Sequence, residues 1–160
     1  MAPTIFDGDH ILVDELVYRF SCPRRGDVVV FKYPKNETQY FIKRVIGLPR
    51  ETILIHQKEC YINGEKIHED YVVHRSYHGF DYPELDNFGP FKVPDNFFFV
   101  MGDNRDWSMD SRSFGPVQKV KIIGKAFMIY WSGSIDQQIF WDRVGSTIES
   151  FSYNPSAISR

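Results

Sequence analysis

Residues 97–112 have the sequence FFFVMGDNRDWSMDSR, in which a run of apolar residues leads directly into a polar cluster. The first five residues are apolar and favour β-structure, which is typical of a buried strand. The eleven residues that follow include two arginines, three aspartates, one asparagine and two serines. Because functional side chains are often carried on loops that a rigid scaffold positions, this stretch predicts a buried strand with a functional site at its end.

The rest of the chain indicates a mostly β fold. Short apolar runs rich in Val, Ile, Phe and Tyr are separated by Gly, Pro, Asn and Asp, and they do not follow helical spacing. Asn63-Gly64 predicts a type I′ hairpin turn, because that turn requires positive φ at both central residues. The predicted strands cover residues 10–13, 27–33, 39–46, 52–56, 59–62, 65–67, 96–101 and 122–131.

The length of 160 residues suits a single domain with a core of useful size. We expect this domain to cover residues 1–145. A segment at about 70–94 is rich in aromatic residues, His, Asp and Pro and has little periodicity, so we expect it to form a small inserted lobe. Residues 146–160 are expected to form a partly disordered C-terminal extension.

Composition narrows the class of protein. The formal net charge of −2 argues against a nucleic-acid-binding protein, which normally carries a basic stripe. The chain has no window of about 18 apolar residues, so we expect it to be soluble as this fragment. Cys22 and Cys60 lack the spacing of a zinc or redox site, and the sequence fits either one disulfide or two free thiols.

Lys43 lies within residues 39–46, QYFIKRVI, and shares a face of the predicted strand with Phe41 and Val45. Burial there would lower the lysine pKa, by as much as ~3–5 units when burial is complete, and leave an amine able to act as a general base. Arg44 points to the opposite face and stays protonated, so we expect it to form a structural ion pair. The alternative is an edge strand on which Lys43 reaches solvent.

The polar loop after the buried strand does not have the pattern of a metal site. A calcium-binding loop that began at Asp103 would place Arg105 and Trp107 where oxygen ligands are needed. One that began at Asp106 would need an acidic residue at Val117. The five histidines show no H-E-x-x-H motif, so we expect no metal and no cofactor.

Two interpretations of this loop remain open. Its acidic and basic residues could form only a network of ion pairs and turn-capping hydrogen bonds. Alternatively, the Ser108 hydroxyl could orient a neutral amine, while Asp110 and Arg112 form a charge pair that fixes the loop.

The chain resembles the type I signal peptidases, membrane-bound serine proteases that remove signal peptides from exported proteins. The resemblance extends to about residue 145, and it implies the antiparallel β-sheet catalytic domain of that family. It rests on blocks that occur in the family's order: MAPTIFDGDHILV at 1–13, RGDVVVF at 25–31, IKRVIGLP at 42–49 and GDNRDWSMDSR at 102–112.

The resemblance implies a role for each matching residue. Lys43 would be the general base, and Ser108 would hydrogen-bond to it and orient it. Asp110 and Arg112 would support the site as a salt bridge, and Asp103 and Arg105 would brace the loop. Five further residues would line shallow apolar pockets that favour alanine-x-alanine before the cut: Met1, Ile5, Ile11, Phe41 and Ile42.

In the family, the nucleophilic serine immediately precedes the methionine matched by Met1, and a membrane anchor lies farther upstream. As written, the chain is therefore expected to be inactive or nearly so, because loss of a nucleophile costs orders of magnitude in rate. The implied partners are signal peptides of exported preproteins and a membrane surface, with no nucleic acid. The full-length protein would lie in the cytoplasmic membrane, with this domain on its periplasmic or extracellular face.

Two other functions stay open. The first is a non-catalytic, signal-peptidase-like module that binds peptides through the same groove. The second is a generic β-rich binding module that does not use Lys43. Restoring a serine ahead of Met1 separates them from a protease, because only a protease would then cut a peptide in a manner that depends on Lys43.

Overall fold

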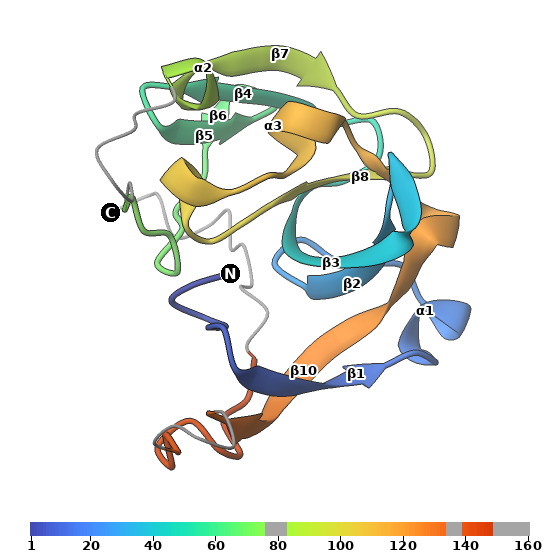
Figure 1. The fold of residues 1–160 in the computed structure, drawn as a ribbon. Helices are drawn as coiled ribbons and strands as arrows, with labels where there is room; N and C mark the ends of the chain where they lie inside the picture. The colour runs from blue at the N-terminus through green and yellow to red at the C-terminus, as the bar shows by residue number, and fades with distance from the viewer. Residues whose placement is uncertain (76–82, 134–138, 149–160) are drawn as a thin grey trace, which may run out of the picture.

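The computed structural model describes residues 1–75, 83–133 and 139–148, and two β-sheets dominate this part of the chain (Figure 1). The strands are β1 (Asp9–Asp14), β2 (Val28–Tyr33), β3 (Asn36–Gly47), β4 (Thr52–His56), β5 (Glu59–Ile62), β6 (Glu65–Lys66), β7 (Phe88–Lys92), β8 (Phe97–Met101), β9 (Val117–Gln118) and β10 (Ile122–Ser132). The short helices are α1 (Val17–Phe20), α2 (Pro83–Asp86) and α3 (Ser111–Phe114), with 3₁₀ turns η1 (Arg105–Trp107) and η2 (Lys119–Lys121).

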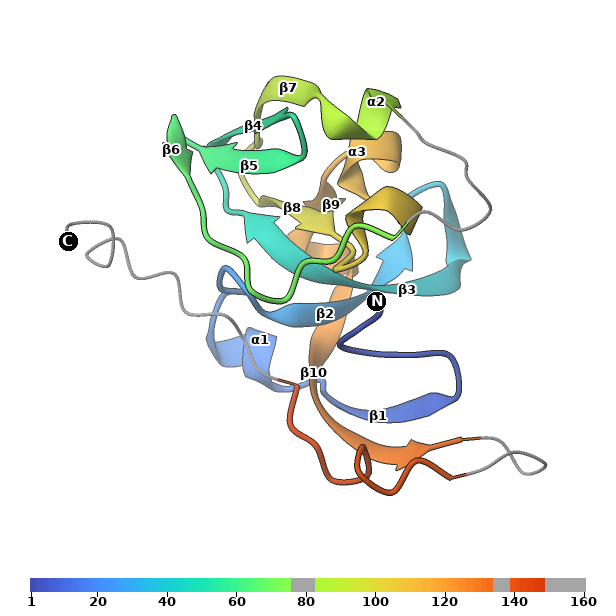
Figure 2. The same ribbon diagram turned by 90° about the vertical axis from the view of Figure 1, so that its left-hand side faces the viewer.

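Six strands form one sheet in the order β1-β10-β2-β3-β8-β9, and four form a second in the order β6-β5-β4-β7. Every neighbouring pair of strands is antiparallel, as predicted. In Figures 1 and 2 the four-stranded sheet lies at the top and β1 with β10 at the bottom, while β3 and β8 lie between them. Both views also place the N-terminus beside β3.

Strand β8 is buried on both faces, which explains its continuous apolar sequence. Phe99 and Met101 pack against the four-stranded sheet in one core cluster, whereas Phe98 and Val100 pack with β2 in another. All eight predicted strands are present, with bounds that agree within three residues. The prediction of a mostly β fold is therefore confirmed.

Strands β7 and β9 were not predicted. Strand β7 contains Gly89 and Pro90, which normally argue against a strand, but it pairs with β4 at the edge of its sheet. Phe88 and Phe91 pack against Phe99, so tertiary contacts override the local sequence. This strand falls within the predicted lobe at 70–94. Residues 76–82 lie outside the described ranges, and the lobe stays a prediction.

The Asn63-Gly64 turn has the predicted conformation, with φ of 53° and 88°. Cys22 and Cys60 are both free thiols, the first exposed and the second buried.

Near the end of the described chain, Ile148 is buried in the core cluster that contains Ile5, so packing continues past residue 145. Residues 149–160 lie outside the described ranges, and the predicted extension stays a prediction. Within the described ranges, no helix is long and apolar enough to span a bilayer.

Candidate active site

Lys43 lies in the middle of β3 and is largely withdrawn from water. Its Nζ lies 5.8 Å from the centre of the Phe41 ring on the same face of the strand. Burial lowers the pKa of the Lys43 amine, and repulsion from Arg112 adds to this effect, while the carboxylates of Asp110 and Asp103 oppose it. The net direction is downward, as expected for a lysine that loses its proton more readily than a surface lysine.

The Ser108 side chain packs against Gly102, the residue after β8, on the side where the Lys43 side chain also lies. A side-chain carbon at Gly102 would overlap the Ser108 hydroxyl, and it would lie 2.8 Å from Ser108 Cβ and 3.8 Å from Lys43 Cδ. The three residues therefore meet at one point, and only a glycine leaves room for the serine. The buried Ser108 Oγ has no hydrogen-bond partner among the described residues, so the hydrogen bond to Lys43 that the resemblance implies is not formed here.

Replacing Gly102 with alanine is expected to destabilise the fold by about 1–3 kcal/mol, because the added methyl group overpacks this contact. At a position without such a clash, a Gly→Ala change raises the free energy of unfolding by about 0.4–1 kcal/mol. The measurement is urea unfolding of Gly102→Ala alone and in a Ser108→Gly background. We expect the destabilisation to disappear in that background; an equal loss in both would contradict the described contact.

Asp110 and Arg112 form a buried ion pair at 2.8 Å. The Asp110 carboxylate also accepts hydrogen bonds from the backbone N–H of Gly102 and of Arg112, and so it caps the start of α3. Arg112 donates further bonds to the backbone carbonyls of Leu85 and Arg105. This pair thus joins the end of β8, η1, α2 and α3 around the position of Ser108.

Asp103 and Arg105 do not pair with each other. Asp103 forms a bidentate ion pair with Arg44, at 2.9 and 2.7 Å, and it also accepts a hydrogen bond from Thr4. The ion pair expected for Arg44 is therefore present and is almost fully buried. Arg105 instead forms a bidentate pair with Glu69, at 2.9 and 2.5 Å.

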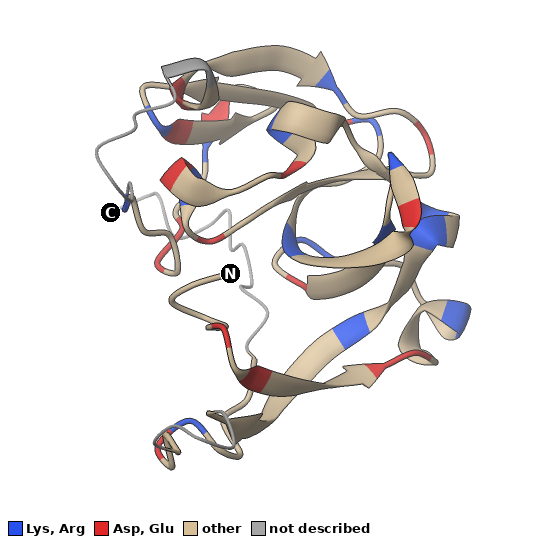
Figure 3. Ribbon diagram, viewed as in Figure 1, with Lys and Arg blue, Asp and Glu red and all other residues tan. Residues whose placement is uncertain are grey.

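The segment 69–75 crosses the polar loop and fixes its path. Val73 exchanges backbone hydrogen bonds with Asp103 and Arg105. His74 contacts Asp106 at 2.9 Å, and Lys58 contacts the same carboxylate at 3.1 Å. Acidic and basic residues both occur between the end of β8 and α3 (Figure 3). The ion-pair network and the charge pair around Ser108 thus exist together, so the two interpretations of this loop do not exclude each other.

Four of the five residues predicted to line apolar pockets meet beside β3. Ile5 is buried in a cluster against which Met1, Ile11 and Ile42 pack. Phe41 lies on the other face of the strand, in the cluster of β2 and β8.

The Met1 α-amino group is partly buried, and both that burial and repulsion from Lys43 lower its pKa. The start of the chain therefore lies next to the Lys43 amine.

Sequence reasoning missed two partners of this site: Thr4 and the segment 69–75, which includes Glu69. Thr4 and Glu69 are 99 and 36 residues away from their partners in the chain, and no local pattern links them. Among the described residues, no group of three or more His, Cys, Asp or Glu side chains is arranged to hold a metal ion.

Known proteins resemble this chain in sequence and in structure. A family model described as signal peptidase, peptidase S26, matches residues 1–131. The probable signal peptidase I-2 of Synechocystis sp. is 37% identical over 136 residues, which cover 82% of this chain and 59% of that protein. Signal peptidase I V of Bacillus subtilis is 40% identical over 130 residues, which cover 78% of this chain and 76% of that protein.

A crystal structure of a signal peptidase I from Enterococcus faecalis V583 has a TM-score of 0.55 and 34% identity to this chain, and the match covers 66% of this chain and 97% of that one. The chain spans about three fifths of the length of the Synechocystis relative, at 59%. The range that the family model matches spans the positions of Lys43 and Ser108. These similarities establish that the chain belongs to the signal peptidase family, peptidase S26.

Proposed function

We propose that this domain cleaves peptide bonds with a serine/lysine dyad in which Lys43 is the general base. The observation that carries the proposal is a lysine that packs close to a buried serine hydroxyl without any described hydrogen-bond partner, and whose amine pKa is lowered by burial. A neutral amine accepts a proton, whereas the arginine next to it remains charged. Family membership supports the same chemistry, because the matching relatives are named signal peptidase I.

In this proposal, the nucleophile is a serine joined to the α-nitrogen of Met1. The pKa of the Met1 amine supports this assignment: burial lowers it most, and repulsion from Lys43 lowers it further, which places that nitrogen near the lysine. A side chain on the preceding residue would then start within a few bonds of the base. The dyad would be completed by the residue on the N-terminal side of Met1.

The reaction is an acyl transfer. The neutral Lys43 amine takes the serine hydroxyl proton as the serine oxygen attacks the peptide carbonyl carbon. Backbone N–H and hydroxyl donors hold the resulting oxyanion. The Lys43 ammonium then gives its proton to the leaving nitrogen as the C–N bond breaks. Water, deprotonated by the same amine, finally hydrolyses the acyl-enzyme and regenerates the serine.

Ser108 is proposed as a positioning residue for Lys43. Leaving a buried hydroxyl without a partner costs about 1–3 kcal/mol, and such groups in native proteins are often functional. A hydrogen bond to the neutral amine would satisfy the hydroxyl and aim the amine lone pair at the nucleophile. Asp110 and Arg112 would keep Ser108 in place through the contacts that join β8 to α3.

The substrate is proposed to bind as an extra strand along β3. Only the last four residues of β3, from Arg44 to Gly47, pair with β8, so the edge of β3 from Asn36 to Lys43 on that side has no described strand beside it. An extended peptide can pair with such an edge through its backbone. Met1, Ile5, Ile11 and Ile42 would then form shallow pockets for small residues, which fits alanine-x-alanine before the cut.

The proposed substrates are signal peptides of exported preproteins. Such substrates reach the outer face of the cytoplasmic membrane, so the full-length protein is proposed to lie there, anchored in the membrane and close to its surface. The names of the matching relatives support this part of the proposal.

The test is cleavage of an alanine-x-alanine peptide by this chain extended by a serine ahead of Met1. We expect cutting directly after the second alanine, and no cutting when alanine replaces the added serine. Peptide binding without any cleavage by the serine-extended chain would favour a non-catalytic peptide-binding module instead.

A further inference from the structure

The N-terminal segment, residues 1–9, leads from the Met1 amine beside Lys43 to the start of β1. It forms two turns. In the first, the Ile5 N–H donates to the Met1 carbonyl at 3.1 Å, and in the second, the Phe6 N–H donates to the Asp9 carboxylate at 2.8 Å. In the proposed reaction this segment carries the nucleophile, because that serine is joined to Met1. Its position therefore decides how closely the serine approaches the base.

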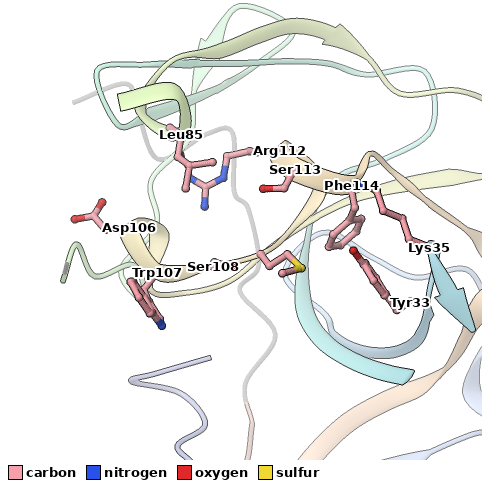
Figure 4. A pocket seen from close by; sticks show the side chains of 10 residues that line it. Tyr33, Lys35, Leu85, Asp106, Trp107, Ser108, Arg112, Ser113 and Phe114 are labelled. Carbon is pink, nitrogen blue, oxygen red and sulfur yellow. Dashed lines mark hydrogen bonds between the residues drawn. The ribbon is translucent and has the colours of Figure 1, made fainter. Parts of the chain in front are cut away.

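The pocket that borders Ser108 gives the N-terminal segment no support. This open pocket has a volume of about 720 Å³, and its walls come from the β2–β3 turn, η1, α2 and α3 (Figure 4). No residue of the N-terminal segment is among the described residues that line it. Lys43 and Ser108 are thus held by β3 and the polar loop, whereas the path to Met1 depends on other contacts.

Thr4 is the point at which those contacts meet. Its hydroxyl donates to Asp103 and accepts a hydrogen bond from Arg44 at 3.2 Å. Its carbonyl oxygen accepts a hydrogen bond from Arg143 Nη2 at 3.1 Å. Thr4 is therefore bound to the candidate site through its side chain and to Arg143 through its backbone.

Arg143 contacts both turns of the N-terminal segment. Besides the Thr4 carbonyl, its guanidinium binds the Asp9 carboxylate, with Nε 3.2 Å from Oδ1. The same group lies over the Phe6 ring, with Cζ 4.5 Å from the ring centre. The Asp9 side chain is 1% exposed, so this ion pair is shielded from water. Because a guanidinium is planar and rigid, these three contacts fix the two turns relative to each other.

The C-terminal segment, residues 139–148, holds Arg143 in place. Backbone hydrogen bonds of 2.8 to 2.9 Å join Gly145, Ser146 and Ile148 to β10. In Figures 1 and 2 this segment runs beside the end of β10 and the start of β1. The range that the family model matches ends at residue 131, so the match does not account for this segment.

We propose that Arg143 is a positioning residue for the nucleophile, because it holds the N-terminal segment where the serine ahead of Met1 can reach Lys43. This inference rests on the proposed function, since it assumes a nucleophile joined to Met1. Arg143 acts through Thr4 and Asp9 and not on the reacting atoms. Without it, the two turns would move apart while β3 and the polar loop keep their places.

The test compares kcat and KM of the serine-extended chain with those of a double variant, Arg143→Met with Asp9→Asn. Arg143→Met alone would leave the Asp9 carboxylate buried without its cation, which strongly destabilises a fold. An asparagine amide at that position can still accept from the Phe6 N–H and donate to Ser132, so we expect the double variant to fold. We expect kcat to fall about 10- to 100-fold, because a misplacement of about 1 Å has an effect of this size, and KM to change less than about threefold.

Two controls separate this role from a purely structural one. Arg50→Met with Asp95→Asn makes the same change in a pair that is 78% and 61% exposed, and it should leave kcat unchanged. Titration of Lys43 by NMR in the Arg143→Met, Asp9→Asn variant should give the same pKa as in the parent chain. A rise of that pKa toward 10.5 together with a loss of kcat would show that the whole site had loosened, and it would overturn the assignment of Arg143 to the nucleophile.

The remaining outcomes separate this inference from the proposed function. If the serine-extended chain cuts the peptide and the Arg143→Met, Asp9→Asn variant keeps its kcat, this inference alone is overturned. An equal fall of kcat in the variant of Arg50 and Asp95 would overturn it as well. If the serine-extended chain itself does not cut, the proposed function fails and this inference fails with it.

Discussion

Replacing Lys43 with methionine is expected to lower peptide cleavage by about 10³- to 10⁴-fold in the serine-extended chain, because methionine keeps the shape of lysine but cannot accept a proton. The measurement is kcat/KM on an alanine-x-alanine peptide. Lys43→Arg serves as the matched variant, since it retains a positive charge that cannot act as a base. We expect it to be equally inactive, and substantial activity in either variant would contradict the role of Lys43.

The same Lys43→Met change is expected to make the fold more stable near neutral pH. The folded state lowers the pKa of Lys43, so between that value and the ordinary lysine value of 10.5 the unfolded chain binds more protons than the folded one. Lys43 therefore weakens folding most below its folded pKa, and this penalty disappears as the pH rises past 10.5. Urea unfolding should show a stability gain for Lys43→Met that shrinks toward high pH. A gain that grew with pH, or a loss at neutral pH, would contradict the burial of the amine.

Replacing Asp103 with alanine is expected to destabilise the domain by about 3–5 kcal/mol, because it leaves the Arg44 guanidinium buried without its carboxylate. Both side chains of this pair are nearly inaccessible, at 2% and 1%. The Arg50–Asp95 pair is a matched control, since its side chains are 78% and 61% exposed. There, Asp95→Ala should cost no more than about 1 kcal/mol.

The measurement is the free energy of unfolding of both variants in urea. A double variant, Arg44→Met with Asp103→Leu, removes both charges and is expected to recover most of the lost stability. Equal effects of Asp103→Ala and Asp95→Ala would show that the buried pair does not hold the start of the polar loop.

The strands could be predicted wherever the sequence and the final packing agree. Residues 39–46 and 97–101 have apolar side chains on the faces that the core buries, so their positions follow from pattern alone. Strand β7 escaped prediction because Gly89 and Pro90 break its local pattern, while Phe88 and Phe91 find their partners in another strand.

The candidate site was predictable in part for the same reason. Because side chains alternate along β3, Lys43 and Arg44 lie on opposite faces of the strand. Lys43 lies over the Phe41 ring on one face, and Arg44 forms its ion pair with Asp103 on the other. The pair between Arg105 and Glu69 was not predictable, because Glu69 lies in a segment without periodicity that reaches the loop only in the folded chain. The close fit of Ser108 over Gly102 likewise depends on the path of the loop, which short motifs do not specify.

The most direct test of this account is a titration of the Lys43 side chain by NMR in the chain described here, with Lys43→Arg used to assign its signal. The account predicts a pKa below the ordinary value of 10.5, caused by burial beside Ser108. Titration at 10.5 or above would mean that the amine is solvated or firmly paired at neutral pH, and it would contradict the proposal that Lys43 is the base.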